Sequence, residues 1–326
     1  MLIISSPSHY SPFNIASEEY LIKNFKDNIL LFYINNPSII IGQNQNTLSE
    51  INFDYVKENN IKVVRRLSGG GAVFHDRGNL NFSFITNIDS GNIINFQKFT
   101  KPVIDTLQKL GVNAKFEGRN DLCIDGKKFS GNASHIYKNR ICHHGTILFN
   151  TNLTHLIKSL NPNDDKFIDK AVKSVQSRVT NICNYLDNSF TIEKIRELII
   201  KQVLVDVKEA KEYTYNEYDI CEITKLFKQK YDTWEWNFGK SPKYNLRKKI
   251  NNPSGKIDSY LFVENGIIKD LHIYGDYFCE LPTEKFIEEI LGCEHKIETI
   301  DNKMKSMDIN SYFLGFKKDE ILKLFF

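Results

Sequence analysis

A run of three glycines constrains this chain more than any other feature of its sequence. Residues 69–71 are all glycine; they follow the residues RRLS and precede the apolar residues 72–74. Consecutive glycines lose much backbone entropy on folding and suit neither a helix nor a strand, but their bare amide groups can form a concavity that binds anions. A plain surface turn is the alternative interpretation. The apolar runs on both sides favour a loop held by a sheet, and therefore a binding site.

The residues around the glycines exclude two common nucleotide-binding motifs. The GxxxxGK[ST] pattern of a P-loop is absent, and a strand rather than a helix follows the glycines, unlike a Rossmann fingerprint. A nucleotide bound here would lie on a loop over a sheet, with its anionic oxygens met by backbone amides and by Arg66, whose guanidinium suits phosphate. His75 follows the loop, and a lone histidine is more often structural than catalytic, so it is predicted only to line the site.

A second informative segment, residues 117–133, contains two lysines after a tight turn. Asp125-Gly126 between two apolar runs predicts a two-residue β-hairpin. Because successive side chains of a strand point to opposite faces, only one of Lys127 and Lys128 can face a site shared with the glycine loop. An ammonium there would neutralise a carboxylate and a phosphate together. A solvated surface lysine is the alternative.

Polar residues beside the hairpin add candidates for metal and phosphate binding. Asn120 and Asp121 could hold Mg²⁺, orient a phosphate or form a turn; one carboxylate suffices for Mg²⁺ when phosphates and waters complete its shell. His143 and His144 interrupt an apolar strand predicted over residues 140–150. Neighbouring residues of a strand diverge and no third ligand is evident, so these histidines do not predict a zinc site.

Periodicity predicts an α/β or α+β architecture in two domains, which suits a length of 326 residues. Helices are predicted over 11–25 (with Ser11 as cap and Pro12 at the first position), 51–58, 99–110, 192–207 and 284–291. Strands are predicted over 29–34, 38–41, 61–65, 72–74, 80–85, 122–124, 127–129, 140–150, 255–263 and 266–274. The strand at 80–85 alternates in polarity and is expected to have one face in a core. A connector at 233–247 separates a large domain, residues 1–245, from a small one, residues 246–326.

Composition and charge indicate a cytoplasmic protein. The net charge of +3 is too small to indicate nucleic-acid binding. Six cysteines without CxxC spacing predict reduced thiols rather than a disulfide framework. The N-terminal sequence MLIISSPSHY lacks the features of a signal peptide, and no apolar run reaches the ~20 residues that span a bilayer, so no membrane partner is expected.

Five segments together resemble the lipoate–protein ligase family. They are RRLSGGGAVFHDRGNLNFSF, GRNDLCIDGKKFSGNA, HHGTILFN, KSVQSRVTNI and TWEWNFGKSPKYN. They stand in the family's order between about residues 65 and 247, and the C-terminal stretch with IYGDYF resembles the family's small accessory domain. The resemblance implies an α+β fold, with a large mixed-sheet catalytic domain of the biotin/lipoate-ligase type and a small C-terminal α/β accessory domain.

The resemblance also implies a reaction, its participants and the residues that act. Lipoate and Mg·ATP would give lipoyl-AMP and pyrophosphate, and a lysine of a lipoyl domain (an E2 subunit of a 2-oxoacid dehydrogenase or the glycine-cleavage H protein) would then attack. Lys128 matches the family's lysine that binds the lipoyl carboxyl and the adenylate phosphate, and Arg66 would contact the nucleotide phosphates. The other residues implied to line the ATP site are Gly71, Ala72, Val73 and Phe74, and less directly Ser68, Gly70, His75, Asn120, Asp121 and His144. A monomer whose small domain rotates about the connector is expected.

Three other functions remain open at this point. An octanoyl- or lipoyl-transferase acts without ATP but needs a thiolate near the lysine, and Cys123 and Cys142 lie within reach in the sequence. A biotin ligase shares the fold, although the RRLSGGGAVFHD segment resembles the lipoate branch. A non-catalytic lipoate-binding protein is the third. The sequence does not determine the acceptor protein or the choice between lipoate and octanoate.

Overall fold

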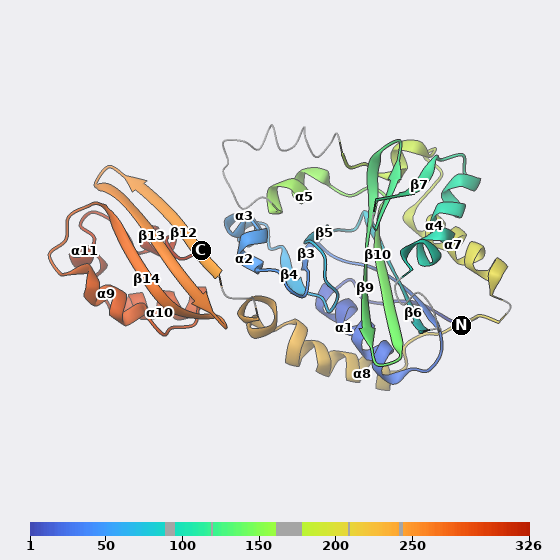
Figure 1. Ribbon diagram of the computed structural model, residues 1–326, viewed down its shortest axis with the longest axis horizontal. Helices are drawn as coiled ribbons and strands as arrows, with labels where there is room; N and C mark the ends of the chain where they lie inside the picture. Colours follow the sequence, from blue (N-terminus) through green and yellow to red (C-terminus); the bar gives the residue numbers. More distant parts are fainter. Residues whose placement is uncertain (89–94, 119, 161–177, 208, 241–243) are drawn as a thin grey trace. The chain divides into compact units, whose positions relative to one another are not determined.

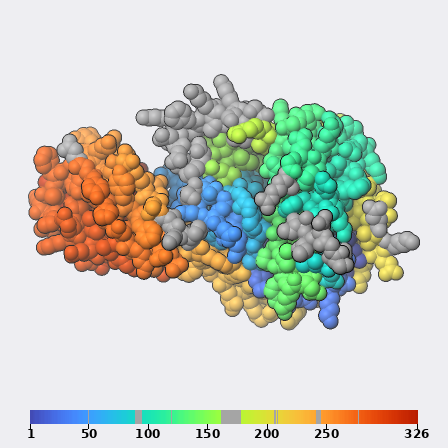
Figure 2. All heavy atoms as spheres, viewed as in Figure 1, coloured from blue at the N-terminus to red at the C-terminus, as the bar shows by residue number. Residues whose placement is uncertain are grey.

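The computed structural model describes residues 1–88, 95–118, 120–160, 178–207, 209–240 and 244–326 (Figure 1). The chain forms two compact units. The first comprises Met1–Gln43 and Asp54–Asp232, and the second comprises Asn44–Phe53 and Thr233–Phe326. A short N-terminal segment thus belongs to the unit formed mainly by the C-terminal part of the chain. Residues 244–326 appear in orange and red in Figure 2.

An eight-stranded mixed sheet is the framework of the first unit. Its order is β11-β1-β2-β6-β10-β9-β8-β7; β1 is parallel to β2 and β11, and the remaining pairs are antiparallel. The strands are β1 (Leu2–Ser5), β2 (Ile29–Ile34), β6 (Asn79–Asn87), β7 (Ala114–Glu117), β8 (Asp121–Ile124), β9 (Lys127–Tyr137), β10 (Arg140–Leu148) and β11 (Lys211–Glu212). The predicted hairpin between β8 and β9 is confirmed.

A smaller sheet of three strands, in the order β4-β3-β5, holds the glycine run. Its strands are β3 (Ser38–Ile41), β4 (Lys62–Arg65) and β5 (Val73–His75). The β3 strand pairs with β4 in parallel and with β5 in antiparallel fashion. Because the glycines connect β4 to β5, both ends of the loop are fixed on β3, as the flanking apolar runs predicted.

Helices cover the large sheet. Among the described residues, the helices of this part of the chain are α1 (Ser11–Asn24), α3 (Phe53–Glu58), α4 (Phe96–Lys109), α5 (Leu153–Ser159), α7 (Ile192–Asp206) and α8 (Glu217–Leu226), with the short helical segments η2 (Ile182–Tyr185) and η3 (Phe227–Tyr231). Helices α4 and α7 pack together over the main core, whereas α1 packs against α8, β6 and β10. None of the helices in the described part of the chain has both the length and the apolar character needed to cross a bilayer.

Some local predictions are wrong in detail. Ser11 is the first residue of α1 and not its cap: Tyr10 occupies that position without a capping side-chain hydrogen bond, so Pro12 is the second residue of the helix and not the first. Helix α4 begins three residues earlier than predicted, because the Asn95 side chain accepts a hydrogen bond from the backbone amide of Lys98. An apolar periodicity cannot detect the start of α4, since it depends on a polar capping residue.

The prediction that β6 has one face in a core is confirmed, and its opposite face is buried as well. Residues 79–85 are all buried, because the polar side chains of this strand face helix α1 and a pocket instead of water. The hydroxyl of Ser83 donates a hydrogen bond to Glu18 on α1, and Asn81 lines the pocket. Alternation of polarity marked the two faces correctly but could not tell a solvated face from a functional one.

The second unit has its own sheet and its own core. Its strands are β12 (Tyr244–Asn252), β13 (Gly255–Glu264) and β14 (Ile267–Asp276), and its helices are α2 (Thr47–Glu50), α9 (Thr283–Ile290), α10 (Ile297–Lys305), α11 (Ile309–Tyr312) and α12 (Lys318–Leu322), with the turn η4 (Glu235–Gly239). The predicted pair β13 and β14 is confirmed, and β12 adds a third antiparallel strand where the sequence predicted part of a connector. Ile257, Leu261 and Phe286 are among the buried residues of the core.

Candidate active site

The hairpin between β8 and β9 presents Lys128 in a fixed position. Asp125 and Gly126 have φ angles of 49° and 73°, which both lie in the left-handed region that a two-residue hairpin turn requires. The backbone amide of Lys128 donates to the carbonyl of Arg178, and its carbonyl accepts from the amide of Thr180. Pairing with β8 on one side and with residues 178–180 on the other therefore fixes the lysine backbone.

The two lysines of the hairpin have different surroundings. Lys127 is exposed, whereas Lys128 is partly buried, and its ammonium lies 2.8 Å from Oδ1 of Asp121 on the neighbouring strand. Asp121 thus orients the ammonium of Lys128 in this structure. Strand alternation predicted that only one of the two lysines would face the site, and the structure shows that this lysine is Lys128.

Arg66 lies beneath the glycine loop and holds it. Its guanidinium donates from Nε to Ser68 Oγ at 2.9 Å, from Nη1 to the carbonyl of Ile40 at 2.9 Å, and from Nη2 to the carbonyls of Gly69 and Gly71 at 2.7 and 2.8 Å. Burial lowers the pKa of Arg66 to about 10, so the side chain is still a cation at neutral pH. The loop therefore folds around a positive charge.

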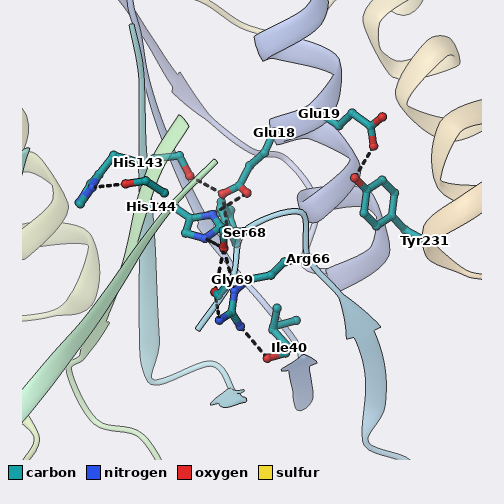
Figure 3. A network of polar contacts seen from close by, with 12 residues as sticks. Glu18, Glu19, Ile40, Arg66, Ser68, Gly69, His143, His144 and Tyr231 are labelled. Atoms are coloured by element: carbon teal, nitrogen blue, oxygen red, sulfur yellow. Dashed lines mark hydrogen bonds and ion pairs between the residues drawn. The ribbon is translucent and has the colours of Figure 1, made fainter. Parts of the chain in front are cut away.

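A buried chain of hydrogen bonds joins this loop to helix α1 (Figure 3). Nε2 of His144 lies 2.6 Å from Ser68 Oγ, and Nδ1 of His144 lies 2.8 Å from Oε2 of Glu18. Burial acts to raise the pKa of Glu18, but the charge and hydrogen bond of His144, with hydrogen bonds from Ser83 and Tyr33, outweigh it and hold the pKa below its usual value. The carboxylate can only accept, so Nδ1 of His144 carries a proton.

Neighbouring residues on α1 and β10 point to opposite sides. Figure 3 shows Glu19 directed away from Glu18, towards Tyr231, whose hydroxyl donates to it. His143 stacks on Phe99 with the ring centroids 4.9 Å apart, on the face of β10 opposite to His144. The two histidines therefore diverge, as the strand pattern predicted, and one of them belongs to the core.

Two pockets open on either side of Lys128. The first, of about 130 Å³, is formed by the glycine loop, β9 and β10; the second, of about 850 Å³, is also lined by α5. Five residues line both pockets: Ala72, Val73, Lys128, Gly131 and Thr146. These five residues mark a junction at which a molecule in one pocket would meet a molecule in the other.

Most residues that the sequence predicted for the site line one of the two pockets. Those in the first pocket are Arg66, Gly70, Gly71, Ala72, Val73, His75, Asn120, Lys128 and His144. Phe74 and Asp121 line the second. Ser68 lines neither, but it contacts Arg66 and His144 directly beneath the loop.

Several lining residues were not predicted from the sequence. Some of them lie within the motifs, which therefore contained a signal: Asn81 in RRLSGGGAVFHDRGNLNFSF, Gly131, Asn132 and Ala133 in GRNDLCIDGKKFSGNA, and Gly145, Thr146 and Leu148 in HHGTILFN. No signal marked the others, which come from distant parts of the chain: Ile15, Tyr33 and Ile40 in the first pocket, and Leu156, Ile157 and Leu160 in the second. Of the segment KSVQSRVTNI, residues 173–177 lie outside the described residues, while Arg178 and Val179 line the second pocket.

The two cysteines that lie within reach of Lys128 in the sequence are poor nucleophiles. Cys123 and Cys142 are buried. Burial and the neighbouring carboxylates Glu117 and Asp121 raise the pKa of Cys123 to about 11, and burial and Glu18 raise the pKa of Cys142 well above its usual value. The thiolate is the reactive form of cysteine, so neither residue suits an acyl transfer through a thioester.

The variant Cys123→Ala is expected to keep its ligase activity within about twofold, because the residue contributes only a small buried side chain to the wall of the second pocket. The measurement is the rate of ATP-dependent acylation of a lipoyl domain. Acylation from an acylated donor protein without ATP, lost in this variant but present in the wild type, would contradict this assignment.

Comparison with known proteins identifies the family of the chain. Residues 11–204 match the family model of the lipoyl protein ligase A/B catalytic domain, and residues 241–325 match that of the bacterial lipoate protein ligase C-terminus. The lipoate-protein ligase LplJ of Bacillus subtilis is 43% identical, over 100% of this chain and 100% of that protein.

Solved structures give the same result for the fold. The bipartite lipoate protein ligase of Thermoplasma acidophilum, described with its E2 lipoyl domain, is 32% identical with a TM-score of 0.68, over 77% of this chain and 98% of that chain. A crystal structure of lipoate-protein ligase A bound with ATP is 30% identical with a TM-score of 0.64, over 73% and 97%. The α+β fold is that of ligases that modify proteins. The chain belongs to the lipoate–protein ligase family and is an enzyme of that kind.

Proposed function

We propose that lipoate and ATP meet at the junction of the two pockets, and that Lys128 is the catalytic residue there. The observation that carries this proposal is that Lys128 lines both pockets and has a fixed backbone. The enzyme joins lipoate to ATP as lipoyl-AMP with release of pyrophosphate, and then transfers the lipoyl group to a lysine of a lipoyl-domain protein.

The first step needs two anions to approach each other. A carboxylate oxygen of lipoate attacks the α-phosphorus, the bond to the β-phosphate oxygen breaks, and pyrophosphate leaves. The ammonium of Lys128, held by Asp121 at 2.8 Å, neutralises the carboxylate and the α-phosphate together and stabilises the charge that develops in the transition state. Arg66 and the amides of the glycine loop add positive potential from the other side.

Mg²⁺ accompanies ATP in this proposal. Asp121 lies beside Lys128 in the second pocket with its side chain partly exposed. A carboxylate oxygen is a ligand that Mg²⁺ prefers, and one carboxylate suffices when phosphates and waters supply the remaining ligands. Asp121 therefore fits a magnesium ion bound mainly through the phosphates of ATP, where the ion would offset their negative charge.

The second step needs an acceptor lysine at the same junction. Its neutral amine attacks the acyl carbon of lipoyl-AMP, and AMP leaves with the electron pair of the broken bond. E2 subunits of 2-oxoacid dehydrogenases and the glycine-cleavage H protein are the acceptors in this proposal; the E2 lipoyl domain described with the archaeal ligase supports the first of them.

The same proposal assigns different roles to the two parts of the chain. The pockets are lined entirely by residues of the first unit, so residues 1–245 act as the catalytic domain and residues 246–326 as an accessory domain. The enzyme works as a cytoplasmic monomer. Six free cysteines support a reducing compartment.

The test is to incubate the protein with lipoate, Mg·ATP and an apo lipoyl domain and to record the mass of the acceptor and the release of pyrophosphate. The expected result is a lipoyl mass gain that requires ATP, with one pyrophosphate released for each acceptor modified. Saturable binding of lipoate without pyrophosphate release would support a non-catalytic binding protein and overturn the proposal.

A further inference from the structure

His75 carries a buried nitrogen that has no hydrogen-bond partner among the described residues. The side chain is 3% exposed and lines the first pocket. Nδ1 lies 3.0 Å from the side-chain amide nitrogen of Asn35, whereas Nε2 has no partner. An unpaired polar atom buried in a protein costs free energy unless a ligand or water satisfies it. The lone Nε2 is therefore a candidate contact for a molecule in this pocket.

A relay of amides fixes which nitrogen of His75 carries the proton. The side-chain nitrogen of Asn14 lies 2.9 Å from the carbonyl oxygen of Ser8, which can only accept, and 2.8 Å from the side-chain oxygen of Asn35. Asn35 thus turns its oxygen to Asn14 and its NH₂ group to His75. Because that NH₂ group donates, Nδ1 of His75 must accept, and the proton of the neutral ring lies on Nε2.

The charge state of the ring agrees with the relay. If the ring of His75 were protonated, its Nδ1 would carry an N–H group as well. That N–H group would face the NH₂ group of Asn35, and two hydrogen-bond donors would then oppose each other. Burial, reinforced by the charges of Arg66 and His144, lowers the pKa of His75 to about 3. His75, which lines the pocket, therefore carries a neutral N–H donor at Nε2 throughout the physiological pH range.

Three strands show where this donor lies along the pocket. Val73 lines the junction, and His75, two residues further along β5, lines the first pocket alone. On β10, Thr146 lines the junction, and His144, two residues away, lines the first pocket alone. On β9, Gly131 and Ala133 are related in the same way. Two residues of a strand span ~7 Å. All three strands thus lead from the junction into the first pocket, which His75 lines without lining the second.

Several other polar groups of the first pocket already have partners. Nε2 of His144 is bonded to Ser68, and the hydroxyl of Tyr33 donates to Glu18. Asn132 has an unpartnered side-chain oxygen, but an oxygen only accepts. Among these groups, Nε2 of His75 is the N–H donor that remains for a ligand.

We propose that Nε2 of His75 donates a hydrogen bond to the dithiolane sulfur of lipoate and so favours lipoate over octanoate. The inference rests on the proposed function, because it requires the carboxyl group at Lys128 and the ring at the far end of the first pocket. Sulfur is a weak acceptor, but the methyl end of octanoate is none at all. A buried donor without a partner disfavours the acid that leaves it unpaired.

The decisive experiment compares the dissociation constants of lipoate and octanoate by calorimetry for the wild type and two variants. His75→Asn keeps an acceptor near the Nδ1 position but lacks a donor at the Nε2 position, whereas His75→Gln restores an N–H group there. In His75→Asn the affinity for lipoate is expected to fall ~5–10-fold, with octanoate changed less than twofold. His75→Gln is expected to retain most of the preference. Equal losses for both acids would overturn the proposal.

A matched control and a second measurement complete the test. His143 is also buried and has an unpartnered Nε2, but it stacks on Phe99 and does not line the pocket; His143→Asn is expected to leave the ratio of the two affinities unchanged. In wild-type protein, ¹⁵N spectra are expected to show the Nε2-protonated form of His75 and a shift of that signal with lipoate only. A proton on Nδ1 of His75 would contradict the inference. No binding of lipoate by the wild type would instead overturn the proposed function.

Discussion

Replacing Lys128 with alanine is expected to reduce the formation of lipoyl-AMP by ~10³-fold, because the reacting carboxylate and phosphate would lose the cation that lies between them. The ammonium lies at the junction of both pockets, and the backbone that carries it is fixed on two sides. Water is a poor substitute for the fixed ammonium of Lys128, because water molecules must reorient during the reaction and this reorientation costs free energy. The rate is measured as lipoate-dependent exchange of pyrophosphate into ATP.

The neighbouring lysine supplies a matched control. Lys127 has the same chemistry but is exposed on the opposite face of β9, so Lys127→Ala is expected to keep the exchange rate within about twofold. The side chains of Lys128 and Asp121, which form an ion pair, are both partly exposed. Exposed ion pairs contribute about 0–1 kcal/mol to the free energy of unfolding. Both variants should therefore unfold close to the wild-type temperature. Comparable losses in the two variants would remove Lys128 from the reaction.

Replacing Arg66 with alanine is expected to reduce ATP-dependent activation by ~10²-fold or more and to release the glycine loop. Arg66 donates to Ser68 and to three carbonyl groups. The exposed carbonyls of Gly69 and Gly71 would find water, whereas that of Ile40 would be left without its donor. Losing that partner is expected to destabilise the fold by about 1–3 kcal/mol. The two half-reactions, measured separately, are expected to differ: transfer from preformed lipoyl-AMP should fall less than activation.

The variant Arg66→Lys separates the charge of Arg66 from its geometry. Lysine keeps the positive charge but cannot reproduce the planar fork that reaches several carbonyls. If Arg66 acts mainly by holding the loop, Arg66→Lys is expected to behave like Arg66→Ala in activation. Recovery of most of the activity by lysine would assign the effect to charge alone, and equal loss in both half-reactions would count against a phosphate role for Arg66.

Local sequence patterns predicted much of the fold. The turn at Asp125-Gly126 is specified by two residues that tolerate left-handed backbone angles, and the strand alternation beyond it separated Lys127 from Lys128. The main helices and strands of the large unit were found because apolar periodicity reports which face of an element is buried. Strands β1, β7, β11 and β12 were not predicted, β9 extends beyond its predicted end to Tyr137, and further errors fell at helix ends.

The candidate site was predicted only where its residues are close together in the chain. The glycine loop and the hairpin contain their own signals. Glu18 contacts His144 across 126 positions of sequence, and Tyr33 enters the pocket from a strand far from either motif. The relay that sets the tautomer of His75 begins at Ser8 and passes through Asn14 and Asn35. No local pattern records such contacts.

The sequence by itself determined most elements of the large unit, the glycine loop, the hairpin lysine and, through five ordered motifs, the family. Each of these depends on the backbone preferences or the spacing of residues that are neighbours in the chain. Only the tertiary structure decided that Lys128 joins two pockets, that the polar face of β6 is buried, and that residues 44–53 belong to the second unit. The physical reason is that sheet order and helix packing bring together residues that are far apart in the sequence. Their spacing along the chain does not indicate that they are in contact.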